Sequence, residues 1–262
     1  MSVTSGDLIF YGSNYMSESD VTVQGSGIDT TTRVVFDSST LANAPAGPVG
    51  VVSSLTTDTG VYVDIYGRNT AGSIVSGTIE VSGNVISSGT TSFERIMKIV
   101  QRPGHSGTIT VQDQNSSVIA TLTSGTAQVR RPFYNVASDI EGGSVRYFYE
   151  KIFLKNNNTT YALLGATIAE VAGGIAGSVD FDLEKYCTDN TSYGSNTSTN
   201  RLTTPDATGM QVGSFDSVAK TLIQDIDLRP SGAIGIWLKL TLGAGVAPSK
   251  STYTMSASGN SI

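Results

Sequence analysis

The amino-acid sequence predicts an all-β protein made of two β-sandwich domains, Ig-like or jelly-roll-like, with little helix. Composition is the first indication: of 262 residues, 39% are apolar and only 15% are charged, whereas 29 are glycine. Disordered chains combine low hydrophobicity with high net charge, but this chain has a mean hydropathy of 0.00 and a net charge of −6. The second indication is a series of short segments in which apolar and polar residues alternate. Their spacing of about ten residues is typical of a sandwich or barrel.

The first half of the chain predicts consecutive hairpins between residues 61 and 122. In VYVDIYG, residues 61–67, three aliphatic residues alternate with Tyr62, Asp64 and Tyr66, so the two sets lie on opposite faces of a strand. Further strands are expected where β-branched runs are bounded by turn residues. These segments are 74–83, 92–100 and the hairpin 107–122.

The second half predicts six more strands, beginning with RYFYEKIFLKN at residue 146. Adjacent arginines, a proline and a glycine pair interrupt the pattern within residues 129–143, which indicates a domain boundary. We therefore expect an N-terminal domain over residues 1–133, with an extended N-terminal arm, and a C-terminal Ig-like domain over residues 134–262. The modest helix candidates are a segment near residue 40 and residues 215–226.

The segment RYFYEKIFLK carries aromatic residues on both faces of any extended structure. We expect Phe148, Ile152 and Leu154 to pack into a core against Trp237. Tyr147, Tyr149 and Phe153 share the other face with two lysines, whose charges favour hydration while their stems lie over aromatic rings. This second face is predicted to meet another domain or subunit across a partly wet contact.

No residue pattern indicates an enzyme. His105 is the single histidine and lies in a turn, and Cys187 is the single cysteine and has no basic neighbour to activate it. Asp180, Asp182 and Glu184 share one face of a strand, a spacing that calcium or a glycosidase pair could use. The favoured interpretation is a solvated face, also for Asp225 and Asp227. We predict no catalytic residue, no metal site and no cofactor.

The charge and hydropathy of the sequence argue against nucleic acid and membrane as partners. No basic patch is visible to neutralise phosphates, so nucleic-acid binding is not expected. The most apolar segment, residues 162–179, is interrupted by Glu170 and several glycines, so we expect no membrane span. The N-terminus shows no signal-peptide pattern, and a lone cysteine favours folding in a reducing cytoplasm. A polar segment over residues 187–209 is long enough to be functional and is expected to be held by neighbouring subunits.

Two stretches carry a resemblance. VYVDIYGRNTAGSIVSGTIEVSGN, with the later SFERIMKIV and GTITV, resembles a hairpin pattern recurrent in tailed-bacteriophage virion proteins. RYFYEKIFLKNNNTTYALLGATIAE, followed by DLRPSGAIGIWLKLTLG and a closing tyrosine strand, resembles a companion domain of such proteins. The second half is also similar to immunoglobulin-like sandwiches in general, without their disulfide.

The resemblance implies a structural virion component, most like a head decoration (cement) protein on the capsid surface. Its partners would be the major capsid protein and copies of itself, as a dimer or trimer, held by many weak contacts. The alternatives are a tail-fibre, spike or surface adhesin domain that binds a receptor or carbohydrate, and a tail or head–tail connector subunit. The interface candidates are Phe10, Tyr11, Tyr15, Tyr147, Tyr149, Phe153 and Tyr193.

Overall fold

Strands form most of the structure, a computed structural model that describes residues 2–16, 18–36, 41, 47–133, 136, 143–171, 179–188, 196–245 and 253–261. These residues contain no α-helix, only the 3-10 turns η1 (Ser5–Asp7) and η2 (Ala207–Gly209), which confirms the all-β class. The helix candidate at 215–226 instead contains the short strand β15 (Lys220–Thr221). The candidate near residue 40 lies largely outside the described residues.

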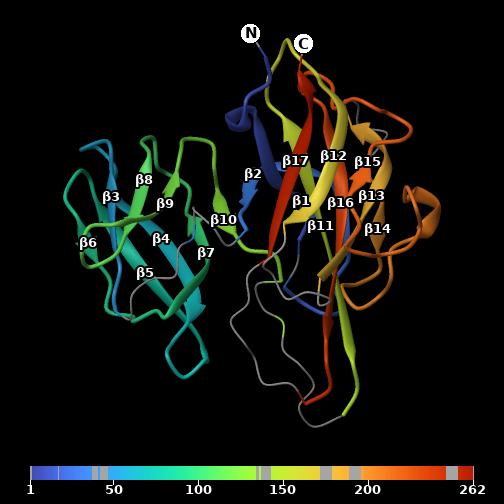
Figure 1. The fold of residues 1–262 in the computed structure, drawn as a ribbon. Helices are drawn as coiled ribbons and strands as arrows, with labels where there is room; N and C mark the ends of the chain where they lie inside the picture. Colours follow the sequence, from blue (N-terminus) through green and yellow to red (C-terminus); the bar gives the residue numbers. More distant parts are fainter. Residues whose placement is uncertain are drawn as a thin grey trace. The chain divides into compact units, whose positions relative to one another are not determined.

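The chain forms two compact units that differ from the predicted domains (Figure 1). One is Thr31–Tyr134, here called the inserted unit; the other joins Met1–Thr30 to Asn135–Ile262 and is here called the split unit. The second boundary falls inside the predicted junction at 129–143. The assignment of residues 1–30 to the N-terminal domain is corrected, because β1 (Leu8–Tyr15) pairs antiparallel with β11 (Arg146–Asn156). The supposed arm is thus an ordinary strand of the split unit.

The inserted unit is a sandwich of two sheets. One sheet has the order β10–β7–β4–β5, preceded by the last residues of β2, and the other has the order β6–β3–β8–β9. Aliphatic residues from both sheets and Phe93 form its core. On β4, Val63 and Ile65 are fully buried whereas Tyr62 is exposed, as the alternation predicts. The strands are β2 (Gln24–Val34), β3 (Gly50–Ser53), β4 (Thr59–Arg68), β5 (Ile74–Ser82), β6 (Ser87–Ser88), β7 (Arg95–Gln101), β8 (Ile109–Gln112), β9 (Val118–Leu122) and β10 (Gln128–Arg130).

The split unit also has two sheets. The larger has the order β13–β16–β11–β1–β2, with β14 added to β2, and the smaller has the order β15–β12–β17. Trp237, on β16, is fully buried, as the sequence predicts for a core residue. It lies opposite Lys151 and packs with Tyr149, so the predicted packing against Phe148, Ile152 and Leu154, on the other face of β11, is wrong. Residues 3 and 261 are in contact, since the Val3 backbone N–H donates to Ser261 Oγ at 2.5 Å. The remaining strands are β12 (Leu163–Val171), β13 (Val179–Thr188), β14 (Thr197–Ser198), β16 (Ala233–Leu242) and β17 (Thr254–Ser261).

No helix among the described residues has the length and apolar character needed to cross a membrane.

Candidate interaction surfaces

The segment after β14, not another subunit, covers part of β11. Glu150 is fully buried and pairs with Arg201, whose Nη2 lies 2.5 Å from Glu150 Oε1. The backbone of Arg201 also accepts a hydrogen bond from the Tyr149 N–H at 2.7 Å. Lys151 is fully buried as well and pairs with Glu184 at 2.6 Å. The prediction that the lysines of this strand keep hydrated charges is therefore wrong for Lys151, because its side chain is buried beside an acidic partner.

The seven predicted interface residues differ in how far their side chains are exposed. Tyr11, Tyr149 and Phe153 are 8%, 5% and 0% exposed, so they are core residues of the chain itself. Tyr15 and Tyr147 remain accessible, at 52% and 45% exposed. Phe10 is half-buried on β1, and Tyr193 lies outside the described residues.

Tyr149 contacts residues of its own unit, so its ring is not available as an interface residue. Its ring packs with Met210, Trp237 and, edge to face at 5.4 Å, Phe215. Its hydroxyl accepts a hydrogen bond from Thr204 Oγ1 at 3.0 Å. Tyr149 therefore fastens the segment after β14 to the sheet.

The carboxylates of β13 do not form a solvated face. Asp182 and Glu184 are buried, and only Asp180 is partly exposed, so the surface interpretation is corrected for two of the three. Asp182 Oδ2 accepts the backbone N–H of Gly213 at 2.8 Å, and Glu184 is paired with Lys151. The strand is covered on its outer edge by isolated bridges to residues 210 and 216, which explains this burial. The described residues contain no group of three or more metal-ligating side chains.

The other chemical candidates have structural contacts. Asp225 accepts the backbone N–H of Cys187 at 3.0 Å, and Asp227 accepts that of Gly165 at 3.0 Å. Cys187 is buried. His105 Nδ1 lies 2.8 Å from the Arg102 carbonyl oxygen. Asp225 and Asp227 thus lie near Cys187, whose thiol is 3.9 Å from the Asp227 carbonyl oxygen, and these printed contacts of the two carboxylates are to backbone N–H groups.

A loop cluster at one end of the inserted unit was not predicted from the sequence. Asp58 is 3% exposed and holds three loops together. Its Oδ2 accepts from Ser53 Oγ at 2.6 Å and from the Gly107 N–H at 2.9 Å, and its Oδ1 accepts from the Ser106 N–H at 3.0 Å. Its backbone oxygen accepts from the Gly83 N–H at 2.9 Å. Hydrogen bonds, led by that from Ser53, hold the pKa of Asp58 below its usual value.

This loop cluster exposes apolar side chains. Leu55 follows directly in the first loop, and Val85 and Ile86 stand in the second; they are 41%, 63% and 50% exposed. Asp58 joins these loops through its carboxylate and its backbone oxygen, so the loops that carry the aliphatic groups are hydrogen-bonded to one another in the free chain. The only sequence signal was the turn composition of SSLTTDTG, which indicates a loop and not its anchor.

A second accessible surface is the outer face of β4. Tyr62, Asp64 and Tyr66 project from it, as predicted, and cations of β7 and the loop after it lie on the tyrosines. Arg102 lies 5.6 Å from the Tyr62 ring centre and Lys98 lies 5.3 Å from that of Tyr66. Arg102 also makes two hydrogen bonds to Asp64, at 2.7 and 2.8 Å. This face therefore combines aromatic rings with charged groups in fixed positions.

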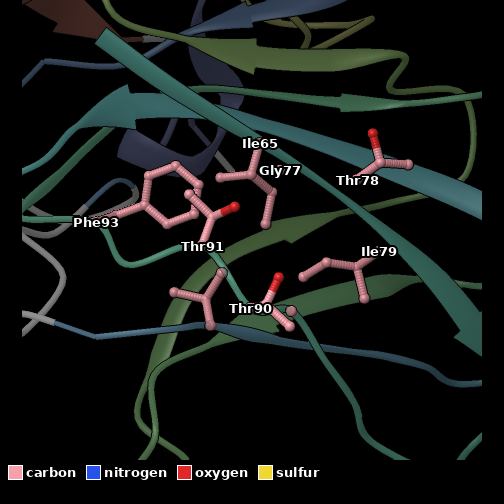
Figure 2. Close-up of a pocket in the computed structure, with 9 residues that line it drawn as sticks. Ile65, Gly77, Thr78, Ile79, Thr90, Thr91 and Phe93 are labelled. Atoms are coloured by element: carbon pink, nitrogen blue, oxygen red, sulfur yellow. The ribbon is translucent and has the colours of Figure 1, made fainter. Parts of the chain in front are cut away.

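A small cavity lies beside β5, lined by the side chains that Figure 2 shows around Phe93, Thr91 and Ile79. Its volume is about 50 Å³. Pockets for small molecules usually have volumes of about 300 to 1,000 Å³. The cavity is thus too small for a metabolite, and the accessible surfaces are the better candidates for binding.

No family model and no curated protein matches the sequence. One solved structure with a weak overlap is titled "Biofilm associated protein - B domain"; it is 9% identical, has a TM-score of 0.22, and the match covers 95% of this chain and 80% of that one. Another belongs to a study of carbohydrate-binding modules from the β-sandwich superfamily; it is 12% identical, has a TM-score of 0.18, and the match covers 90% and 96% of the two chains. Similarity at this level supports no conclusion about fold or function.

Proposed function

We propose that the chain is a non-catalytic decoration protein of a virion, which binds the major capsid protein and stabilises the shell through many copies. The resemblance of its hairpin and strand patterns to tailed-bacteriophage virion proteins supports the capsid as partner. The structural observation that carries the proposal is the loop cluster, a preformed surface on which Leu55, Val85 and Ile86 are exposed. A preformed surface loses little conformational entropy on binding, which suits contacts that are individually weak.

The test is binding to expanded, empty capsids of the parent phage. The wild-type chain is expected to bind stoichiometrically and to raise the melting temperature of the capsids. The double variant Leu55→Ser/Val85→Ser is expected to bind at least about tenfold more weakly, as for the loss of interface hot spots. Val118→Ser is the matched control, because Val118 is 59% exposed on β9 but lies outside the loop cluster. Equal binding of the double variant and the control would contradict the role of the loop cluster.

The outer face of β4 favours a second candidate, an adhesin domain that binds carbohydrate or a receptor. Tyrosine rings and hydrogen-bonding charged groups are the components with which proteins recognise sugars and protein surfaces. An adhesin would bind glycans or host cells, would lose that binding in Tyr62→Ala/Tyr66→Ala, and would leave capsids unaffected. Capsid binding without glycan binding would exclude this candidate.

A further inference from the structure

Lys151 of β11 and Glu184 of β13 meet above the strand that separates them. Lys151 Nζ lies 2.6 Å from Glu184 Oε1, and the two side chains are 0% and 4% exposed. Gly235 of β16 lies beneath the Glu184 carboxyl group, and any side chain at this position would collide with it. Because Gly235 has no side chain, it leaves room for the Lys151 nitrogen and the Glu184 carboxyl group to approach each other.

The surroundings of this pair are closed and largely aromatic. Lys151 Nζ lies 4.8 Å from the ring centre of Phe153 and 5.9 Å from that of Trp237. It also donates to the backbone oxygens of Ser26 and Asn196, at 2.9 and 3.1 Å. These residues cover the pair and keep bulk water from it.

Burial acts against the charged form of both groups. Neither oxygen of Glu184 meets strict hydrogen-bond geometry within the described residues, although Lys151, the Trp237 side chain and the Asn196 backbone lie close enough to lower its pKa. Burial raises the pKa of Glu184 and lowers the pKa of Lys151, while the attraction between the two groups opposes both shifts. Transfer of one proton from lysine to glutamate gives a neutral amine beside a neutral carboxylic acid. A buried ion pair repays its desolvation only when its remaining hydrogen bonds are made.

We propose that Lys151 and Glu184 condense into an intramolecular amide (isopeptide) bond after the split unit has folded. The lone pair of the neutral amine attacks Glu184 Cδ, and a new C–N bond forms. The C–OH bond breaks, the nitrogen gives up one proton to the departing hydroxyl, and water leaves. No oxidant, cofactor or further reactant is required, and two buried charges are replaced by one neutral amide. The fold supplies the proximity that makes such reactions fast, since oriented intramolecular groups behave as if at concentrations of about 10⁵ M or more.

The direct test is the intact mass of the folded and then denatured chain. The wild type is expected to be lighter than its sequence by one water, and peptide mapping is expected to find the Lys151 peptide joined to the Glu184 peptide. Lys151→Met is expected to have the full mass of its sequence. Lys185→Met, which changes a neighbouring lysine that donates to the Thr208 carbonyl oxygen, is expected to keep the deficit of one water. A natively folded wild-type chain at full mass would overturn the proposal and leave an ordinary ion pair.

Two further variants keep the test informative if Lys151→Met fails to fold. In Glu184→Gln the same attack would release ammonia and give the same amide, so its final mass is expected to equal that of the wild type. The double variant Lys151→Met/Glu184→Gln keeps the approximate volume of both side chains without their charges, and it is expected to fold at full mass. A near-ultraviolet circular dichroism spectrum establishes the fold of each variant.

Discussion

At the scale of single residues, β11 buries opposite charges on its two faces. Glu150 and Lys151 are consecutive, so their side chains leave the strand on opposite sides, and each finds its partner in a segment that follows later in the chain. Arg201 forms an ion pair with Glu150 and also donates to the Glu18 carbonyl oxygen at 3.1 Å. Its guanidinium lies 5.6 Å from the ring centre of Phe148. The Arg201 side chain therefore connects the loop at Glu18, and the polar segment after β14 in which it lies, to β11.

Removing this side chain is expected to be costly. Arg201→Ala removes a fully buried cation 2.5 Å from the buried carboxylate of Glu150, which should lower the free energy of unfolding by about 3 to 5 kcal/mol. The matched control is Arg102→Ala, which breaks the ion pair with Asp64, where the arginine side chain is 50% exposed. That loss should be much smaller, because solvent screens an exposed ion pair. Urea unfolding of both variants measures the difference, and equal losses would show that Arg201 contributes no more than a surface pair.

At the scale of elements, the strands follow from the sequence wherever only one face is buried. The alternation on β4 predicted which residues face the core and which project outward, because period-two burial is a local property. The same pattern could not predict what covers β11. Its coverings are Arg201 and the residues around Tyr149's ring, and no local spacing relates them to the strand. The loop cluster around Asp58 was likewise not predicted, since the hydrogen bonds that Asp58 accepts from Gly83, Ser106 and Gly107 link residues far apart in the chain.

Tyr149 and Tyr147 of β11 differ in burial, so their alanine variants should differ in stability. Tyr149→Ala removes a buried ring and should lower the free energy of unfolding by about 3 kcal/mol. Tyr147→Ala alters a ring that is 45% exposed and lies 4.8 Å from Lys239 Nζ, so the loss should be about 1 kcal/mol or less. Thermal and urea unfolding measure both. A larger loss for Tyr147→Ala would mean that this ring is covered in the free protein.

The loop cluster should depend on pH through Asp58. Its pKa in the folded protein is below the ordinary value of 3.8, so its contribution to stability is present above that value and is lost as pH falls through the folded pKa. Asp58→Asn should therefore unfold more easily than the wild type at pH 7, and the difference should shrink as the solution becomes more acidic than the ordinary value. Urea midpoints of both proteins across this range measure the effect. A difference that stays constant with pH would exclude ionisation of Asp58 as its source.

At the scale of the whole molecule, the two units have different requirements for folding. All of the core of the inserted unit comes from Thr31–Tyr134, whereas the split unit needs β1 from the first thirty residues. A fragment of residues 31–134 should unfold cooperatively on heating. A fragment of residues 135–262 should not, because β11 would expose an unpaired edge, which favours aggregation. Removal of residues 2–3 alone, before η1, is the control and should be tolerated. A cooperative transition in the 135–262 fragment would show that β1 is dispensable.

The pairing of β1 with β11 also sets an order of events during synthesis. The ribosome releases β1 first, but its partner strand, and β16 beyond it, emerge only after the whole inserted unit has been made. At usual rates of translation, the interval from residue 31 to residue 242 is about 10 to 40 s. During that time the inserted unit can fold, and β1 can already lie beside β2, while the edge of β1 that pairs with β11 stays open. That edge is thus among the last to be covered, and nascent chains arrested before residue 146 should leave β1 more open to proteolysis than the complete chain does.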